Sequence, residues 1–163
     1  MGRIWAAIAT FAAGLCGCGP AGDAGRGSVA VAVPTDDAGI ETATQHARST
    51  IDEFKQALAH PKPEQSDFSV KVELHEDGGV HYLWLQQVTW TGSGFSGTLG
   101  SDASGMKDHK PGEAATIAAE QVSDWMYVEN KKLVGGFTLR AIRDRLRGAQ
   151  REAFEKSLWF AFE

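Results

Sequence analysis

The 163-residue chain has only two cysteines, both within its first 18 residues, which excludes a disulfide scaffold. Its longest uncharged apolar run covers residues 4–15, whereas a membrane-spanning helix needs about 20 residues. Its glycines follow no collagen repeat, and a hydrophobic content of 42% is too high for a disordered protein. The net charge of -5 argues against nucleic acid as a partner. These absences leave a single globular domain.

Residues 1–17 have the features of a lipoprotein signal peptide. A positive charge at Arg3 precedes the apolar run, and the segment ends in Leu15-Cys16-Gly17-Cys18, which resembles a bacterial lipobox. A leucine three places before Cys18 and a small residue directly before it make Cys18 the predicted lipidation site. The alternative is an ordinary cleaved signal with two incidental cysteines. Cleavage and lipidation would leave no free thiol for catalysis, redox chemistry or metal binding.

A lipid anchor on Cys18 predicts a membrane as the first partner of the protein. Gly19 follows the cysteine, where such lipoproteins carry aspartate when they are retained at the inner membrane. The resemblance therefore predicts a cell-envelope protein at the outer membrane, facing the periplasm. Residues 18–40 are rich in glycine, alanine and proline, so they are expected to form the lipidated cysteine and a flexible tether. The folded domain is then expected over residues 41–163.

Hydrophobic periodicity predicts an α+β fold. Apolar residues at steps of three and four indicate an amphipathic helix over 42–58, before two prolines. Period-two alternation indicates a strand over 68–75, paired in a hairpin with 80–90. Further strands are predicted over 95–99, 122–129 and 133–137; residues 114–122 suit either helix or strand; and C-terminal helices are predicted over 138–148 and 150–163. The antiparallel sheet is thus expected to have about five strands built from hairpins.

The length of the first hairpin loop decides which aromatic residues face the core. A three-residue Asp-Gly-Gly loop pairs Leu74 with Tyr82 and directs both Tyr82 and Trp84 inward. A loop of even length instead directs Leu83 and Leu85 inward. The three-residue loop is the favoured prediction.

From Phe68 onward the chain resembles the bacterial family called domain of unknown function 2314, which includes YegJ-like lipoproteins. Two correctly spaced blocks at 122–127 and 135–140 are the most specific part of this resemblance. The residues that carry it are Asp77-Gly78-Gly79, Trp84-Leu85, Phe95-Ser96-Gly97-Thr98-Leu99, Lys110-Pro111-Gly112-Glu113, Val122-Ser123-Asp124-Trp125-Met126-Tyr127 and Gly135-Gly136-Phe137-Thr138-Leu139-Arg140. The chain departs from the family pattern at Glu113-Ala114-Ala115, where the family has an aspartate and a more β-branched strand. The resemblance implies a compact α+β domain that occurs alone or fused in larger proteins, and it implies no activity.

No catalytic or cofactor motif is present. His75 and His81 would lie opposite each other in the three-residue hairpin, with Glu73 nearby, but no zinc-binding spacing supports a metal site. The string Gly92-Ser93-Gly94 lacks the spacing of a nucleophile elbow and is typical of a turn. We therefore expect no catalytic residue, no metal and no cofactor.

Positive charge gathers in residues 131–151, which carry seven basic side chains against Asp144 alone. Arg140, Arg143 and Arg147 fall on one face of the predicted helix and form a candidate site for an anion, a protein or an acidic envelope partner. The alternative is a solvated face whose arginines pair with acidic groups.

Trp125 and Tyr127 alternate along one predicted strand. They form an aromatic platform for sugars or a peptide if they point outward, and part of the core if they point inward. The sequence favours a non-catalytic, lipid-anchored binding or interaction domain. The alternatives are an enzyme of undetected mechanism acting on cell-envelope material and, by analogy with other small bacterial domains, an immunity-type inhibitor of a toxin.

Overall fold

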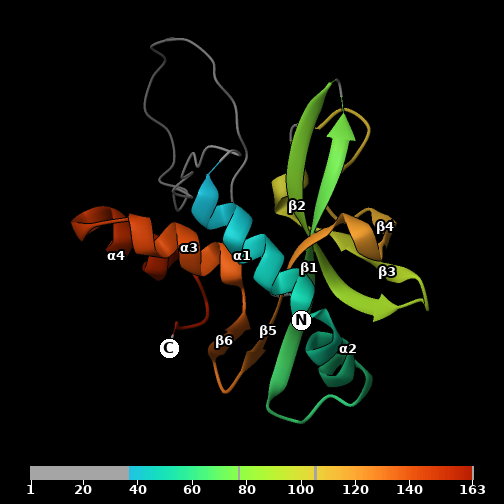
Figure 1. Cartoon of the computed structure of the whole chain (residues 1–163), viewed down its shortest axis with the longest axis horizontal. Helices are drawn as coiled ribbons and strands as arrows, with labels where there is room; N and C mark the ends of the chain where they lie inside the picture. Colours follow the sequence, from blue (N-terminus) through green and yellow to red (C-terminus); the bar gives the residue numbers. More distant parts are fainter. Residues whose placement is uncertain (1–36, 77, 105, 163) are drawn as a thin grey trace, which may run out of the picture.

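The computed structural model describes residues 37–76, 78–104 and 106–162, and within them an α+β fold (Figure 1). The elements in chain order are α1 (Ala38–Ser49), α2 (Ile51–Ala59), β1 (Gln65–Glu76), β2 (Gly79–Trp90), β3 (Gly94–Leu99), the 3-10 turn η1 (Ser101–Ala103), β4 (Ala114–Ala118), the 3-10 turn η2 (Ala119–Gln121), β5 (Val122–Glu129), β6 (Lys132–Gly135), α3 (Phe137–Arg145) and α4 (Gly148–Ser157). The predicted fold class is confirmed.

The strands form one antiparallel sheet in the order β4-β3-β2-β1-β5-β6. The sheet has one strand more than the five predicted. The additional strand is β4, so residues 114–118, which suited either helix or strand, form a strand. Alanine is a weak strand former, but pairing with β3 along five residue pairs holds this segment in the sheet.

The first helix begins at Ala38, three residues before the predicted start of the domain, and Asp37 caps it by accepting hydrogen bonds from Gly39 N and Ile40 N. The helix expected over 42–58 is interrupted at Thr50, whose φ of -108° and ψ of 10° are not helical. The Thr50 hydroxyl donates to His46 O and Ala47 O, an alternative to regular helical geometry. α1 and α2 are therefore separate helices.

The predicted register of the first hairpin is wrong. Glu76 pairs with Gly79 and Val72 pairs with Leu83, so the loop has two residues. An Asp-Gly pair suits a two-residue turn, and Gly78 has the positive φ (+76°) that such turns favour. Because of this register Leu83 and Leu85 lie in the buried cluster that contains Phe54, and Tyr82 and Trp84 lie on the opposite face of the sheet.

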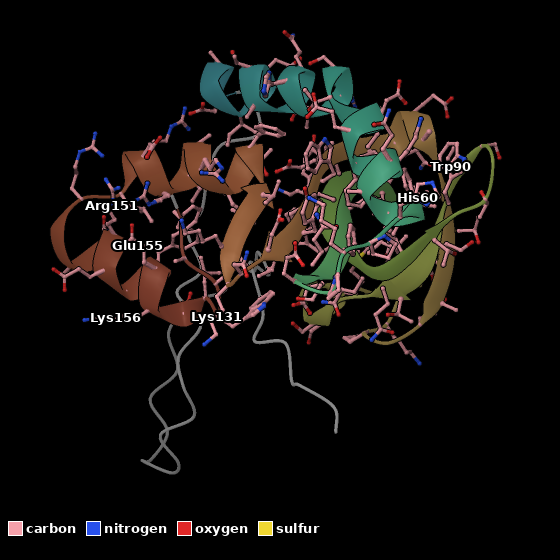
Figure 2. All side chains as sticks on the ribbon, turned by 90° about the horizontal axis from the view of Figure 1, so that it is seen from below. His60, Trp90, Lys131, Arg151, Glu155 and Lys156 are labelled. Atoms are coloured by element: carbon pink, nitrogen blue, oxygen red, sulfur yellow. The ribbon has the colours of Figure 1, made fainter. Side chains whose placement is uncertain are left out.

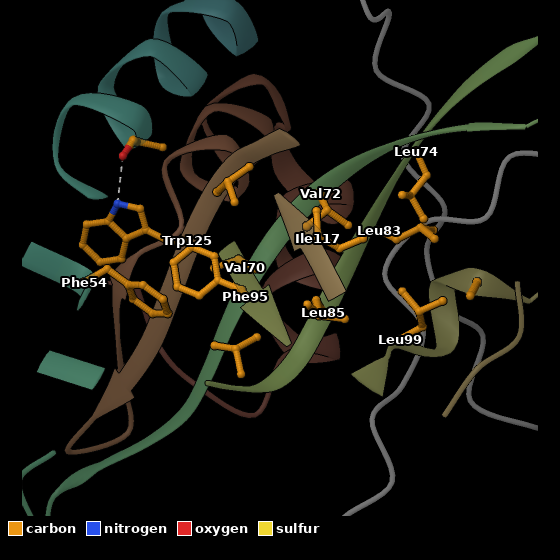
Figure 3. Close-up of a cluster of buried hydrophobic side chains, with 14 residues drawn as sticks. Phe54, Val70, Val72, Leu74, Leu83, Leu85, Phe95, Leu99, Ile117 and Trp125 are labelled. Atoms are coloured by element: carbon orange, nitrogen blue, oxygen red, sulfur yellow. Dashed lines mark hydrogen bonds between the residues drawn. The ribbon is translucent and has the colours of Figure 1, made fainter. Parts of the chain in front are cut away.

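The sheet buries hydrophobic side chains in two clusters. The first joins β1, β2, β3 and β5 to Phe54 of α2 (Figure 3), and the second joins Trp84 and Met126 to α3, α4 and the C-terminal segment. Trp125 is 3% exposed in the first cluster, and its indole Nε1 donates to Ala47 O at 3.0 Å. α1 also packs against α3, and both helices contact β5.

The C-terminal helices differ from the prediction. The N-cap of α3 is Gly136 rather than Thr138, and α3 ends at Arg145 instead of continuing to Gly148. Beyond α4, the segment near Ala161 pairs with β6: Leu133 N donates to Ala161 O, and Ala161 N donates to Lys131 O. Among the residues that the structure describes, no helix has the length and apolarity needed to cross a membrane.

Candidate functional site

A polar pocket of about 150 Å³ opens where α1 and α3 meet the sheet. Four of its side chains are charged: Glu41, Arg48, Lys71 and Glu73. The remaining lining residues are Ile40, Thr44, Tyr82, Ser123, Thr138 and Ile142. Since they come from α1, β1, β2, β5 and α3, only the folded chain brings these groups together.

The wall of the pocket on β1 and β2 is a connected polar array. Lys71 Nζ lies 3.4 Å from Thr138 Oγ1 and 5.6 Å from the centroid of the Tyr82 ring. Glu73 is hydrogen-bonded to Tyr82 and lies 3.1 Å from His75 Nε2. Partial burial raises the pKa of the Tyr82 phenol, and the Glu73 carboxylate raises it further. Tyr82 therefore stays a protonated donor at neutral pH.

The opposite wall is formed by α1. Arg48 Nε donates to Val122 O at 2.9 Å, which fixes the guanidinium at the rim. Glu41 accepts a hydrogen bond from Gln45 Nε2 at 2.9 Å. Both side chains are otherwise exposed, so this wall presents one positive and one negative group to solvent.

Asp124 lies directly behind the pocket and organises the start of α3. Its Oδ1 accepts hydrogen bonds from Trp125 N and Phe137 N, and its Oδ2 accepts from Thr138 N and Thr138 Oγ1 at 2.8 and 2.6 Å. Burial raises the pKa of the Asp124 carboxyl, while the hydrogen bonds from Thr138 and Trp125 and the charge of Lys71 oppose that shift. This carboxylate satisfies backbone groups at the start of α3 that would otherwise lack partners.

Two glycines complete the same junction. Gly135 and Gly136 have φ of +71° and +62°, a left-handed conformation that side chains rarely adopt. A Cβ on Gly135 would lie 2.4 Å from Trp125 O, and Gly136 N donates to Trp125 O at 2.8 Å. The turn from β6 into α3 therefore requires glycine at these two positions.

The protein-family model described as "Uncharacterized protein conserved in bacteria (DUF2314)" matches residues 37–162 of the chain. The chain belongs to the DUF2314 family. It is 30% identical to the uncharacterized protein YegJ of Escherichia coli K12 over 104 residues, 64% of this chain and 67% of YegJ. It is also 27% identical to a putative ankyrin repeat protein of Neisseria meningitidis serogroup B over 132 residues, 76% of this chain but 52% of that protein. No solved structure matches the chain significantly.

The two sequence blocks most specific to the DUF2314 resemblance meet in this structure. Asp124, from the block at 122–127, binds the backbone of Phe137 and Thr138 from the block at 135–140. Arg140 of the second block folds back, donating to Gly135 O at 2.9 Å and to Leu133 O at 2.7 Å. These blocks therefore build the junction that places Thr138 in the pocket.

The predicted arginine face does not form on this DUF2314 domain, because α3 ends before Arg147. Arg140 is bound to backbone carbonyls, Arg143 donates to Glu155 Oε1 at 2.6 Å, and Arg147 donates to Asp144 O and Leu146 O. Figure 2 shows Glu155 beside Arg151, which lies 3.1 Å from the same carboxylate oxygen. Hydrogen bonds from Arg143 and Arg151 lower the pKa of Glu155. Among the described residues, Arg143 is the one of the three that pairs with acidic groups, whereas Arg140 and Arg147 are held by backbone carbonyls. A binding role for the three arginines stays a prediction.

Of the two alternatives for Trp125, the structure shows the core one, because this side chain is buried in the first cluster. Tyr127 is half-buried and stacks on Phe68 with ring centroids 5.0 Å apart. Met126 and Val128 point to the opposite face and are buried too, because α3 and α4 cover that side. Both faces of β5 therefore serve packing.

The histidine pair does not form either. In the two-residue hairpin His75 lies opposite Val80 and His81 opposite Leu74, so the two imidazoles point to opposite faces. Among the residues that the structure describes, no group of three or more potential metal ligands occurs. Cys18, the predicted lipidation site, lies outside the described residues.

Sequence reasoning missed the pocket residues. Lys71 and Glu73 lie on the polar face of an alternating strand, a pattern typical of solvated side chains. The signal available in the sequence was a lysine and a glutamate on one face of a strand that pairs with the strand carrying Tyr82, and this pattern does not distinguish a binding site from a solvated face.

Proposed function

We propose that this DUF2314 protein is a lipid-anchored binding domain of the bacterial envelope that holds a small polar ligand in the pocket between α1, α3 and the sheet. The lipobox at Leu15-Cys16-Gly17-Cys18 supports an anchor on Cys18, and Gly19 supports an outer-membrane location facing the periplasm. The envelope partner is then the ligand of the pocket rather than a surface recognised by the arginine helix.

The observation that carries the binding function is the convergence of four charged side chains and Tyr82 around one cavity. Ligand sites are concave and use a few placed polar groups to orient the ligand. Here the placed groups are Arg48, Lys71, Glu41, Glu73 and Tyr82, with the buried Thr138 hydroxyl 3.4 Å from Lys71 Nζ.

Binding fits this site better than catalysis. Asp124 is the buried carboxylate with a raised pKa that an acid or base catalyst would require, but both of its oxygens accept hydrogen bonds from the start of α3. It does not line the pocket. Its role is therefore to hold α3 in place.

The pocket is tested by ligand capture. The purified full chain is incubated with a small-molecule extract of bacterial envelopes, washed, denatured and analysed for released molecules by mass spectrometry. We expect the wild type to release a molecule that Arg48→Gln retains at least tenfold less, because Arg48 contributes charged hydrogen bonds at the rim. Arg151→Gln, which removes the same charge from α4, is the matched control and should retain the molecule fully. Equal retention by Arg48→Gln and the wild type would contradict the pocket assignment.

The anchor is tested separately. When cells that express the full chain are grown with radioactive palmitate, the wild type and the Cys16→Ser variant should be labelled, and Cys18→Ser should not. Cleavage before Cys18 removes Cys16, so loss of the label in Cys16→Ser alone would mean that Cys18 is not the lipidated residue. Unlabelled wild type would reject the anchor.

A further inference from the structure

We propose that the pocket takes a small zwitterion, with its carboxylate at Arg48 and Lys71 and its ammonium group at Glu41 and Glu73. This inference rests on the proposed function and names the ligand class for the same site. The lining holds two cations and two carboxylates. A purely anionic ligand would face both glutamates, and a purely cationic ligand would face both basic residues, so a molecule with both signs matches the lining best.

The charges are arranged so that one small molecule can reach both signs. Lys71 and Glu73 are alternate residues of β1, so they point to the same face about 7 Å apart. Glu41 and Arg48 are separated by two turns of α1, about 10 Å. Tyr82 lies on the same wall as Lys71 and Glu73, and it interacts electrostatically with Glu73, Arg48 and Glu41. Each of the two walls therefore carries one positive and one negative side chain.

The groups on α1 retain capacity for a ligand. In the described part of the chain, Arg48 uses only Nε, toward Val122 O, so its terminal nitrogens can meet a carboxylate as a planar fork. Glu41 accepts from Gln45 through Oε1, and its Oε2 accepts no hydrogen bond from the described residues. A carboxylate and an ammonium group would supply these two partners.

The size of the cavity restricts the ligand. A cavity of about 150 Å³ accommodates a molecule as large as benzene, which has six non-hydrogen atoms. Alanine also has six, and Ile40 and Ile142 provide apolar contacts for its methyl group. The smallest α-amino acids, free or at the end of a larger molecule, therefore fit the site in size and in charge.

Calorimetric titration of the full chain tests this inference with three small probes that share a three-carbon skeleton and differ in charge: alanine, propionate and propylamine. We expect alanine to bind at least tenfold more tightly than either singly charged probe. Glu41→Gln should weaken alanine binding about tenfold and strengthen propionate binding, because it removes an ammonium partner and a repulsive charge. Arg48→Gln should weaken both. Asp52→Asn, which removes an exposed carboxylate from α2, should change neither.

The outcomes separate this inference from the proposed function. Propionate binding as tightly as alanine would identify an anion pocket, and propionate binding left unchanged by Glu41→Gln would show that Glu41 does not face the ligand. Either result would overturn the zwitterion while the binding function stands. If none of the probes binds but ligand capture through Arg48 succeeds, the ligand belongs to another class and the inference is wrong. If capture fails as well, both proposals are wrong.

Discussion

Replacing Asp124 with alanine is expected to lower the free energy of unfolding by about 4 kcal/mol. The side chain is fully buried and accepts four hydrogen bonds, three from backbone N–H groups and one from the Thr138 hydroxyl. Alanine leaves these donors without partners, and Thr138, which supplies two of them, is only 1% exposed to water. Equilibrium unfolding in urea, followed by tryptophan fluorescence, measures the loss.

Two variants make the Asp124 result interpretable. Asp124→Asn keeps one carbonyl oxygen and the shape of the side chain, so it should lose about half as much stability as alanine. Asp144→Ala removes an aspartate whose side chain is 67% exposed on α3 and should change stability by less than about 0.5 kcal/mol. A loss below about 1 kcal/mol for Asp124→Ala would mean that α3 does not depend on this carboxylate.

Gly135→Ala is expected to destabilise the protein by about 3 kcal/mol. A Cβ at this position would lie 2.4 Å from Trp125 O and 2.5 Å from the indole ring, and φ is +71°. The substitution therefore combines backbone strain with a clash that the buried Trp125 cannot relieve by moving. The measurement is again urea unfolding.

Gly112→Ala separates these two causes. Gly112 has a similar φ of +80°, but a Cβ there would have no atom within 4 Å. It should lose only the strain contribution, about 1 kcal/mol. Equal losses of stability at both positions would show that the clash with Trp125 contributes nothing and that backbone strain alone explains the cost of Gly135→Ala.

Periodicity predicted most elements of this fold but not their junctions: it predicted one helix where α1 and α2 form, and it left β4 open between helix and strand. The alternation over 68–75 identified β1 because one face of that strand is buried, and burial imposes a period of two. The register of the hairpin depends on loop length, which alternation does not contain, and the two-residue turn reversed the predicted faces of Leu83 and Trp84.

The candidate site was harder to predict for a related reason. The arginine spacing assumed a helix that continues past Arg145, but Leu146 leaves the helix with ψ of 145° and is buried in the second core. Lys71 and Arg48 are far apart in the sequence, and each is ordinary for its own element. Only the meeting of α1 with α3 over β5 makes them a site, and that packing is tertiary information.

The most direct test of the central claim is an amide chemical-shift map of the full chain, recorded by NMR with the molecule that ligand capture releases. If the pocket is the functional site, the largest shifts should fall on Thr44, Lys71, Ser123 and Thr138, and α4 should be unaffected. Shifts confined to Arg147, Arg151 and their neighbours on α4, with the pocket unchanged, would contradict the account.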